Sequence, residues 1–233
     1  MTAERALPEL SGPVEDYLKA IYELELRGGV AGTNEIAAAL RIAAPSVSGM
    51  IRRLSSQGLV THEPYKGVQL TREGRRAALR TIRRHRVIEA YLTQALGYPW
   101  DRVHDEAERL EHAASDELID RMAAAIGEPE TDPHGAPIPS REGTLGNEPE
   151  LSALAELADG AQARISRVGD RDAERLRYLA NLGMAIGAEV ELVSREPYDG
   201  PITVKIDGKR RVIGPELARH ILVETKKRGG KRS

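Results

Sequence analysis

Residues 82–117 constrain the fold more than any other stretch, because they carry histidines and carboxylates at helical spacing in two successive segments. In the first segment His85 and Glu89 are four residues apart, so both side chains project from one face of a helix. A short loop at 97–100 follows and favours antiparallel contact between the two helices. The stripe on the second helix consists of His104, Glu108, Glu111 and His112.

Carboxylates and imidazoles on facing helices are one way in which bundles build metal sites. The alternative is that these side chains are solvated surface pairs, which contribute only tenths of a kcal/mol. Either helix alone fits that alternative, whereas the two together favour a site for a divalent cation. A donor set of oxygens and imidazole without thiolate suits Mn²⁺ or Fe²⁺, and Zn²⁺, Co²⁺ or Cd²⁺ are expected to substitute in vitro.

Composition limits the other possibilities. A length of 233 residues suggests two or three modest domains. The chain has no cysteine, which excludes a disulfide framework, a thiolate metal site and a cysteine nucleophile. It lacks an apolar run of membrane-spanning length and a secretory signal pattern, so we expect a cytoplasmic protein without a membrane partner. Segment 71–86 is basic and segment 104–120 is acidic, which predicts an anionic and a cationic partner.

The first third of the chain is predicted to be a winged helix-turn-helix. Helical patterns at 13–27, 34–42 and 45–57 precede two short strands around a turn at Lys66-Gly67. Such a unit inserts its last helix into the major groove, and the small, polar outward face favours DNA over a protein partner. Thr33 is also the predicted N-cap of its helix. The residues predicted to contact DNA are Thr33, Pro45, Ser46, Ser48, Gly49, Arg52, Arg53 and Lys66.

The middle of the chain is predicted to be helical, at 72–96, 103–113 and 115–126. Its faces are rich in Leu and Ala and favour a homodimer, which would place two recognition helices roughly 34 Å apart. Residues 127–149 are dense in Pro, Gly and polar residues and predict a linker or loop, in which His134 is expected to be exposed.

From residue 151 the apolar pattern changes to alternation, which predicts a small β-barrel. Asp207-Gly208 is a hairpin-turn signal, and one helix in this part is expected to end at Gly183. The chain ends in a basic tail that would add weak affinity for DNA. The fold class is therefore mainly α with a small β domain.

In this order the parts resemble, over nearly the whole chain, the iron- and manganese-dependent regulators of the diphtheria toxin repressor family. The matching motifs are DYLKAIYELE at 16–25, the helix-turn-helix at 33–54, HRVIEAYL at 85–92, VHDEAERLEHAASDE at 103–117 and GAPIP at 135–139. The third part resembles the family's SH3-like, or FeoA-like, domain. The resemblance implies a winged helix-turn-helix at 1–78, a helical metal-binding and dimerisation domain with linker at 79–150, and an SH3-like domain with basic tail at 151–233.

The same resemblance implies two metal sites. The primary ligands are Asp16, Glu108, Glu111 and His112, and the ancillary ligands are His85, Glu89 and His104, completed by Asp172 and Glu174. Asp16 and Glu108 match the manganese branch of the family, whereas the iron branch has Met and Cys there. Lys19 stands where the short manganese regulators carry a second acidic ligand, which favours a single primary ion. Gly49 replaces a Gln of the iron regulators, so the base preference is expected to differ.

The implied function is a metal-dependent transcriptional regulator, most simply of the Mn²⁺ type, that binds double-stranded operator DNA as a metal-loaded homodimer and controls manganese or iron homeostasis genes. The sequence leaves open whether it represses or activates, although the family's usual mode is that of a repressor. In the hypothesis for its mechanism, three carboxylates repel one another in the metal-free primary site. A cation that neutralises them ties the first helix to the dimerisation region and sets the distance between recognition helices.

Two other regulators stay open: an Fe²⁺-responsive member of the same family, and a constitutive winged-helix DNA-binding protein without a metal switch. An enzyme with a small-molecule substrate is disfavoured by the motifs. The chain lacks the H-E-x-x-H pattern of zinc proteases, the paired Glu-x-x-His of di-iron bundles, and any Ser/His/Asp or nucleotide-loop signature.

Overall fold

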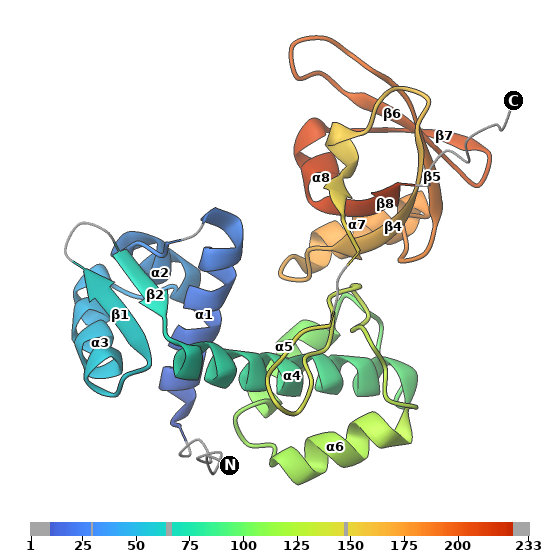
Figure 1. Ribbon diagram of the computed structural model, residues 1–233. Helices are drawn as coiled ribbons and strands as arrows, with labels where there is room; N and C mark the ends of the chain where they lie inside the picture. Colours follow the sequence, from blue (N-terminus) through green and yellow to red (C-terminus); the bar gives the residue numbers. More distant parts are fainter. Residues whose placement is uncertain (1–9, 29, 64–66, 147–148, 226–233) are drawn as a thin grey trace, which may run out of the picture. The chain divides into compact units, whose positions relative to one another are not determined.

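The computed structural model describes residues 10–28, 30–63, 67–146 and 149–225 (Figure 1). By contact the chain divides into two compact units, each with its own apolar core. The first unit comprises Met1–Ile88, Glu108–Arg121 and Ile138–Gly146, and the second comprises Glu89–Ala107, Met122–Pro137 and Asn147–Ser233. The helices between the predicted DNA-binding and SH3-like domains contribute to both units, so the domain borders proposed from the sequence stay predictions.

The first half of the chain folds as a winged helix-turn-helix followed by three helices (Figure 1). The elements are α1 (Gly12–Gly28), α2 (Thr33–Leu40), α3 (Ala44–Ser56), β1 (Val60–Glu63), β2 (Gly67–Leu70), α4 (Arg72–Gln94), α5 (Val103–Leu110) and α6 (Asp116–Ala125). Strands β1 and β2 pair antiparallel as the wing.

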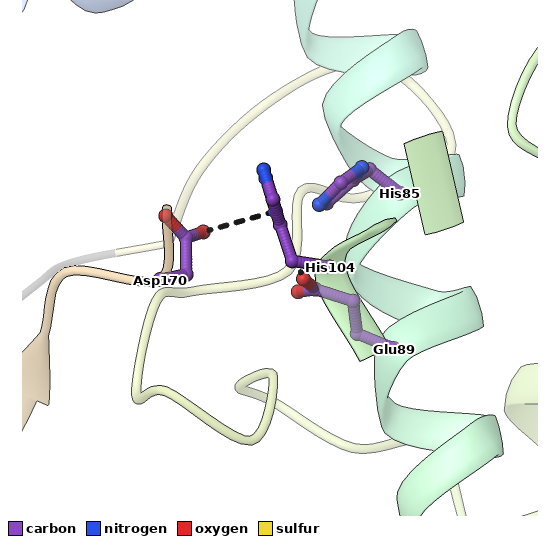
Figure 2. Close-up of side chains that lie close together, drawn as sticks. All are labelled: His85, Glu89, His104 and Asp170. Atoms are coloured by element: carbon purple, nitrogen blue, oxygen red, sulfur yellow. Dashed lines mark ion pairs between the residues drawn. The ribbon is translucent and has the colours of Figure 1, made fainter. Parts of the chain in front are cut away.

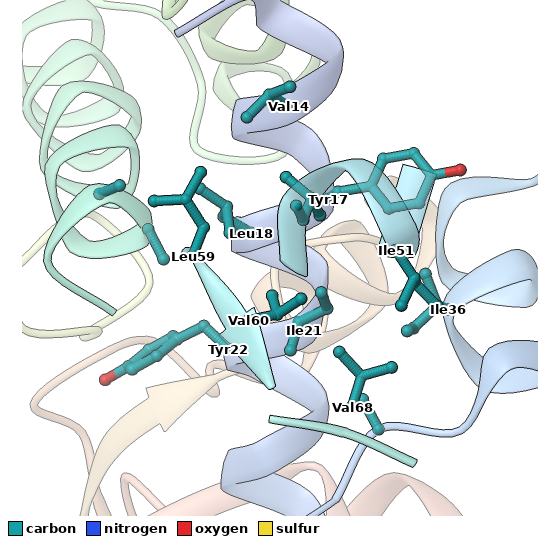
Figure 3. Packing of buried hydrophobic residues seen from close by; sticks show 14 of the residues in the cluster. Val14, Tyr17, Leu18, Ile21, Tyr22, Ile36, Ile51, Leu59, Val60 and Val68 are labelled. Carbon is teal, nitrogen blue, oxygen red and sulfur yellow. The ribbon is translucent and has the colours of Figure 1, made fainter. Parts of the chain in front are cut away.

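The core of the first unit lies between α1, the helix-turn-helix and the wing, and Figure 3 shows this packing. Leu18 and Ile21, three residues apart on α1, are fully buried there, as are Ile36 of α2 and Ile51 of α3. Burying such side chains contributes about 1.5–3 kcal/mol each, so the spacing of apolar residues on α1 fixes which face turns inward.

The start of α2 differs from the prediction, because its N-cap is Gly32 and Thr33 is the first helical residue. The backbone N–H of Gly32 donates to Glu35 Oε2 at 2.8 Å. A carboxylate in the first turn therefore satisfies this end of the helix, so no cap from a Thr hydroxyl is needed. The turn at Lys66 and the basic tail lie outside the described residues.

The second unit is built on a six-stranded antiparallel sheet in the order β3-β8-β4-β5-β6-β7. The elements are β3 (Ser152–Ala153), the 3₁₀ helix η1 (Leu154–Glu156), β4 (Gln162–Val168), α7 (Ala173–Leu182), β5 (Glu189–Arg195), β6 (Ile202–Ile206), β7 (Lys209–Ile213), α8 (Pro215–Arg219) and β8 (Ile221–Thr225). The predicted turn is confirmed, since Asp207 and Gly208 both have positive φ between β6 and β7. Gly183 caps α7 in the left-handed conformation, as expected.

The segment predicted as a linker or loop is in part an ordered loop, but His134 is buried, only 1% exposed, and the prediction that it is exposed was wrong. The carboxylate of Asp132 accepts hydrogen bonds from the backbone N–H groups of His134 and Ala136, at 2.8 and 2.9 Å. Gly135 has a φ of +84°, and a Cβ there would lie 1.9 Å from the carbonyl oxygen of Ser166. This close backbone approach holds the loop against β4.

No helix within the described ranges is both long and apolar enough to cross a membrane.

Candidate metal centre

Six ionisable residues of the first unit gather where α1 meets α4 and the C-terminal end of α5. We call them the first cluster: Asp16, Lys19, His85, Glu108, Glu111 and His112. Asp16 and Lys19 are three residues apart, so α1 presents a carboxylate and an ammonium on the same face. The structure thus brings together ligand atoms of three predicted primary residues, Asp16, Glu111 and His112. Glu108 instead groups with Glu111 and with His85, which was predicted as an ancillary ligand, and Lys19 lies among these three.

The imidazole of His112 lies between two carboxylates of α1. Its Nε2 is 2.8 Å from Asp16 Oδ1, and its Nδ1 is 2.7 Å from Glu15 Oε2. These hydrogen bonds, first that to Asp16 and then that to Glu15, outweigh partial burial and raise the pKa of His112 to about 10. Glu15 also accepts from Arg84 at 2.8 Å.

Lys19 is the centre of the other half of this cluster. Its Nζ donates to Glu108 Oε1 at 2.7 Å and to both oxygens of Glu111 at 2.9 and 3.0 Å. His85 Nδ1 lies 3.2 Å from the same nitrogen and 2.5 Å from Glu111 Oε2. Burial alone would lower the pKa of Lys19, but the charges of Glu111 and Glu108 outweigh it and raise that pKa.

The sequence hypothesis of mutually repelling carboxylates therefore needs correction. Lys19 neutralises Glu108 and Glu111, Arg84 pairs with Glu15, and His112 bridges to Asp16. The cluster therefore supplies its own cations opposite its carboxylates. Lys19 entered the prediction only through the number of ions, and its charge was left out of the repulsion hypothesis, although Lys19 shares a helix face with Asp16.

The second unit contains two further groups of donor atoms that share Glu89, namely Glu89 with His104 and Asp170, and Glu89 with Asp132 and His134. We call these five residues the second cluster. His104 Nδ1 lies 3.4 Å from Glu89 Oε1 and 3.9 Å from Asp170 Oδ2. One ligand atom each from Glu89, Asp132 and His134 likewise lies within 4.8 Å of the others. Figure 2 shows Glu89, His104 and Asp170 turned toward one another, with His85 one turn before Glu89 on α4.

The imidazole of His134 has a defined orientation in the second cluster. Its Nε2 donates to the backbone carbonyl of Trp100 at 2.8 Å, and its ring stacks on the indole at 5.8 Å between centroids. A carbonyl oxygen only accepts, so Nε2 carries a proton and Nδ1 faces Glu89 Oε2 at 3.7 Å. Nδ1 is buried without a hydrogen-bond partner in the described parts of the chain. Such a carbonyl contact at one nitrogen is how metal-ligating histidines are held.

Asp172 and Glu174, the predicted ligands from the SH3-like part, do not join this cluster. Asp172 is the N-cap of α7 and accepts from the backbone N–H of Arg175 at 3.0 Å, while Glu174 is exposed in the first turn. Asp170, two residues before the cap, lies beside His104 instead. The N-cap preference of Asp could have assigned Asp172 from the sequence. The sequence signal that could have identified Asp132 and His134 as metal-ligand candidates is their spacing of two residues in a loop rich in Pro and Gly.

The predicted DNA-binding face is the exposed side of α3. Pro45, Ser46, Ser48, Gly49, Arg52 and Arg53 are exposed there, while Thr33 is half-buried at the start of α2. The opposite side of α3 buries Val47, Ile51 and Leu54 in the core. Lys66 lies outside the described residues.

Three family models match consecutive parts of the chain. The N-terminal DNA binding domain of the iron dependent repressors matches residues 9–68, and their metal binding and dimerisation domain matches 71–140. The FeoA domain matches residues 153–225. The order of the matches follows the order of the elements described above.

Among characterised relatives, the diphtheria toxin repressor of Corynebacterium glutamicum is 32% identical and is aligned over 94% of this chain and 98% of its own length. The iron-dependent repressor IdeR of Mycobacterium tuberculosis is 32% identical over 93% and 98%. Among solved structures, a manganese-dependent transcriptional repressor in complex with manganese has a TM-score of 0.84 and 39% identity, with coverage of 91% and 100%. The structure of ScaR with bound Zn²⁺ has a TM-score of 0.79 and 29% identity, covering 91% and 98%.

Proposed function

This chain belongs to the diphtheria toxin repressor family of metal-dependent transcriptional repressors, and on that premise we propose that it is a Mn²⁺-responsive repressor that binds operator DNA as a homodimer. The members of this family are repressors and not enzymes. The proposal concerns the ion, its ligands, the dimer and the DNA contacts.

The observation that carries the proposal is the second cluster. Glu89 is fully buried, and His134 and Asp132 are nearly so, yet their donor atoms converge. Burying carboxylates is costly unless they are paired or coordinate a metal. His134 Nδ1, the buried nitrogen opposite Glu89, is placed as a ligand atom would be. The donors of Glu89, Asp132 and His134 thus fit a divalent cation, and Glu89 with His104 and Asp170 forms a second such group.

In the first cluster the donor set Asp16, Glu111 and His112 also fits a divalent cation, since their ligand atoms lie within 4.8 Å of one another. We propose Mn²⁺ for both clusters because all the donors are carboxylate oxygens and imidazole nitrogens. The relatives named iron-dependent repressors make Fe²⁺ the alternative, and similar proteins have been solved with manganese and with Zn²⁺ bound.

A bound ion supplies positive charge that carboxylates on different helices can share. In this chain Asp16 is the donor on α1, and α1 packs against α2 and the wing strand β2. The carboxylate of Glu25, also on α1, accepts from the backbone N–H of Leu70 in β2 at 2.6 Å. A restraint on α1 therefore reaches the whole DNA-binding part, and any gain in DNA affinity must equal the gain in metal affinity on DNA.

For DNA, the proposed contacts lie at the exposed start of α3. Pro45 stands in the first turn, where backbone N–H groups and the hydroxyls of Ser46 and Ser48 suit phosphate or base contacts. Arg52 and Arg53 supply sequence-independent, salt-sensitive affinity. Two such helices in a homodimer match two half-sites about one helical turn apart.

The test is a fluorescence-anisotropy titration with labelled DNA from the region upstream of the chain's own gene. The metal-stripped protein is compared with protein at matched free Mn²⁺, Zn²⁺ and, anaerobically, Fe²⁺. We expect at least about 10-fold tighter binding with Mn²⁺, the factor that 1.4 kcal/mol of coupling provides. Glu89→Gln and His134→Gln should lose most of that gain. The control His220→Gln changes an exposed histidine of the second unit and should keep it.

Equal DNA affinity with and without metal would refute the proposal and leave a constitutive winged-helix protein. A gain with Fe²⁺ but none with Mn²⁺ would assign the switch to iron. Sedimentation equilibrium of the metal-loaded protein with a single operator tests the homodimer, because two chains per DNA duplex are expected.

A further inference from the structure

The group His85, Glu108 and Glu111 has the donor chemistry of a cation site, with ligand atoms within 4.8 Å of one another. In the structure that place is taken by the Lys19 ammonium. Its nitrogen donates to three carboxylate oxygens of Glu108 and Glu111 at 2.7–3.0 Å and lies 3.2 Å from His85 Nδ1. Glu111 is fully buried and Lys19 nearly so, which makes this an interior contact and not a surface ion pair.

The positions of Lys19 and its partners in the fold support the same conclusion. Lys19 comes from α1, whereas its partners come from α4 and from the end of α5, so the ammonium joins three segments. An ammonium has three protons and no acceptor, and three carboxylate oxygens lie within hydrogen-bond distance of this one. A divalent ion among the same atoms would lie next to a fixed positive charge, and like charges disfavour each other strongly at such distances.

We propose that Lys19 is the permanent cation of the first cluster: it takes the place of a metal ion among His85, Glu108 and Glu111 and limits the cluster to one ion, beside Asp16 and His112. The inference rests on the proposed metal function for the ion count, but the position of the ammonium is independent of it. Lys19 thereby determines the stoichiometry of metal binding and ties α1 to α5 when metal is absent.

The experiment counts bound Mn²⁺ by electron paramagnetic resonance of the free ion after equilibrium dialysis. It uses the full chain with Glu89→Gln, which disables the second cluster. With Lys19 present we expect one ion per chain at saturation, and with Lys19→Met we expect one more. Lys19→Arg retains the charge and should keep the lower count. The control Lys205→Met removes an exposed lysine of β6 and should not change it.

Two results would overturn the inference: a second ion in the first cluster with Lys19 intact, or the same count in Lys19→Met as in its parent. The ion count with Lys19 intact does not require the Lys19→Met variant. The inference can therefore be refuted even if Lys19→Met does not fold. If the unmodified chain binds no Mn²⁺, the proposed function fails. An ion that then appears only in Lys19→Met would still support Lys19 as the occupying cation.

Discussion

Arg84→Met is expected to destabilise the first unit by about 2–3 kcal/mol in the absence of metal. The Arg84 side chain is 11% exposed, and it donates to Glu15 Oε1 at 2.8 Å and to Asp116 Oδ1 at 3.2 Å. Removing one partner of a buried ion pair costs about 3–5 kcal/mol, because the other charge stays buried. Glu15 keeps His112 Nδ1 at 2.7 Å, which lowers the expected loss to the smaller range.

The assay is thermal unfolding followed by far-UV circular dichroism in excess chelator. For a chain of this size 1 kcal/mol corresponds to about 2–4 °C, so Tm should fall by roughly 4–12 °C. Met preserves most of the aliphatic stem, so lost packing contributes little. The matched control is Arg121→Met, whose partner Glu117 is on the same helix and whose side chain is 76% exposed. Its effect should stay within about 0.5 kcal/mol.

The same variant has a functional consequence. Arg84 donates to the Glu15 carboxylate, which in turn contacts His112 Nδ1. This contact orients the imidazole so that its Nε2 points toward Asp16. We therefore expect weaker Mn²⁺ binding at the first cluster in Arg84→Met, measured by calorimetric titration. An unfolding temperature of Arg84→Met equal to that of Arg121→Met would refute the reasoning, because the Arg84 guanidinium would then not stabilise the buried Glu15 carboxylate.

Three further outcomes are expected. Mn²⁺ should change the fluorescence of Trp100, the only tryptophan, since its ring stacks on His134, and Glu89→Gln should abolish that change. Gly135→Ala should cost about 3 kcal/mol or more in denaturant unfolding, because φ is +84° and the added Cβ would meet the Ser166 carbonyl oxygen at 1.9 Å. Arg52→Ala should weaken DNA binding on all sequences alike and reduce the salt slope by about 1.

Each of these outcomes has a matched control in the second unit. His220→Gln should leave the Trp100 response intact. Gly214→Ala has open space at the Cβ position and should cost less than about 1 kcal/mol. Arg219→Ala removes an exposed arginine outside the winged helix and should not change the salt slope. A variant that behaves like its control would contradict the corresponding prediction.

The helical part of the candidate site followed from the sequence because spacing alone fixes a helix face. Glu108, Glu111 and His112 were found by their spacing, whereas Asp16 was implied by the family resemblance. Asp16 meets Glu111 and His112 because the periodicity that buries Leu18 and Ile21 also orients Asp16. The turn at Asp207-Gly208 was equally accessible, since few residues adopt positive φ at two successive positions. These features are local, and local chemistry decides them.

The loop residues of the site were not accessible in this way. Whether His134 is exposed or buried depends on Trp100, more than 30 positions earlier, and on the fit of Gly135 against β4. Asp170 and Asp172 are both acidic and two residues apart. Only the position at which α7 begins shows that Asp172 is the helix cap and Asp170 the ligand candidate. Strand β8 was also missed, because its short apolar run precedes a basic tail without a turn signal.

The contacts of Lys19 bear on how a switch could work in this chain. A contact that exists with and without metal stabilises both states equally and cannot shift the equilibrium between them. The metal-dependent share of the restraint on α1 must then come through Asp16, three residues before Lys19. We therefore expect Asp16→Asn to abolish the Mn²⁺-dependent gain in DNA affinity while metal-free affinity stays within about twofold, a difference near 0.4 kcal/mol. Lys19→Met should instead lower metal-free affinity, because α1 loses its tether to Glu108 and Glu111. Anisotropy titrations of both variants in chelator and in Mn²⁺ separate the two roles, and an unchanged Mn²⁺ gain in Asp16→Asn would place the switch elsewhere.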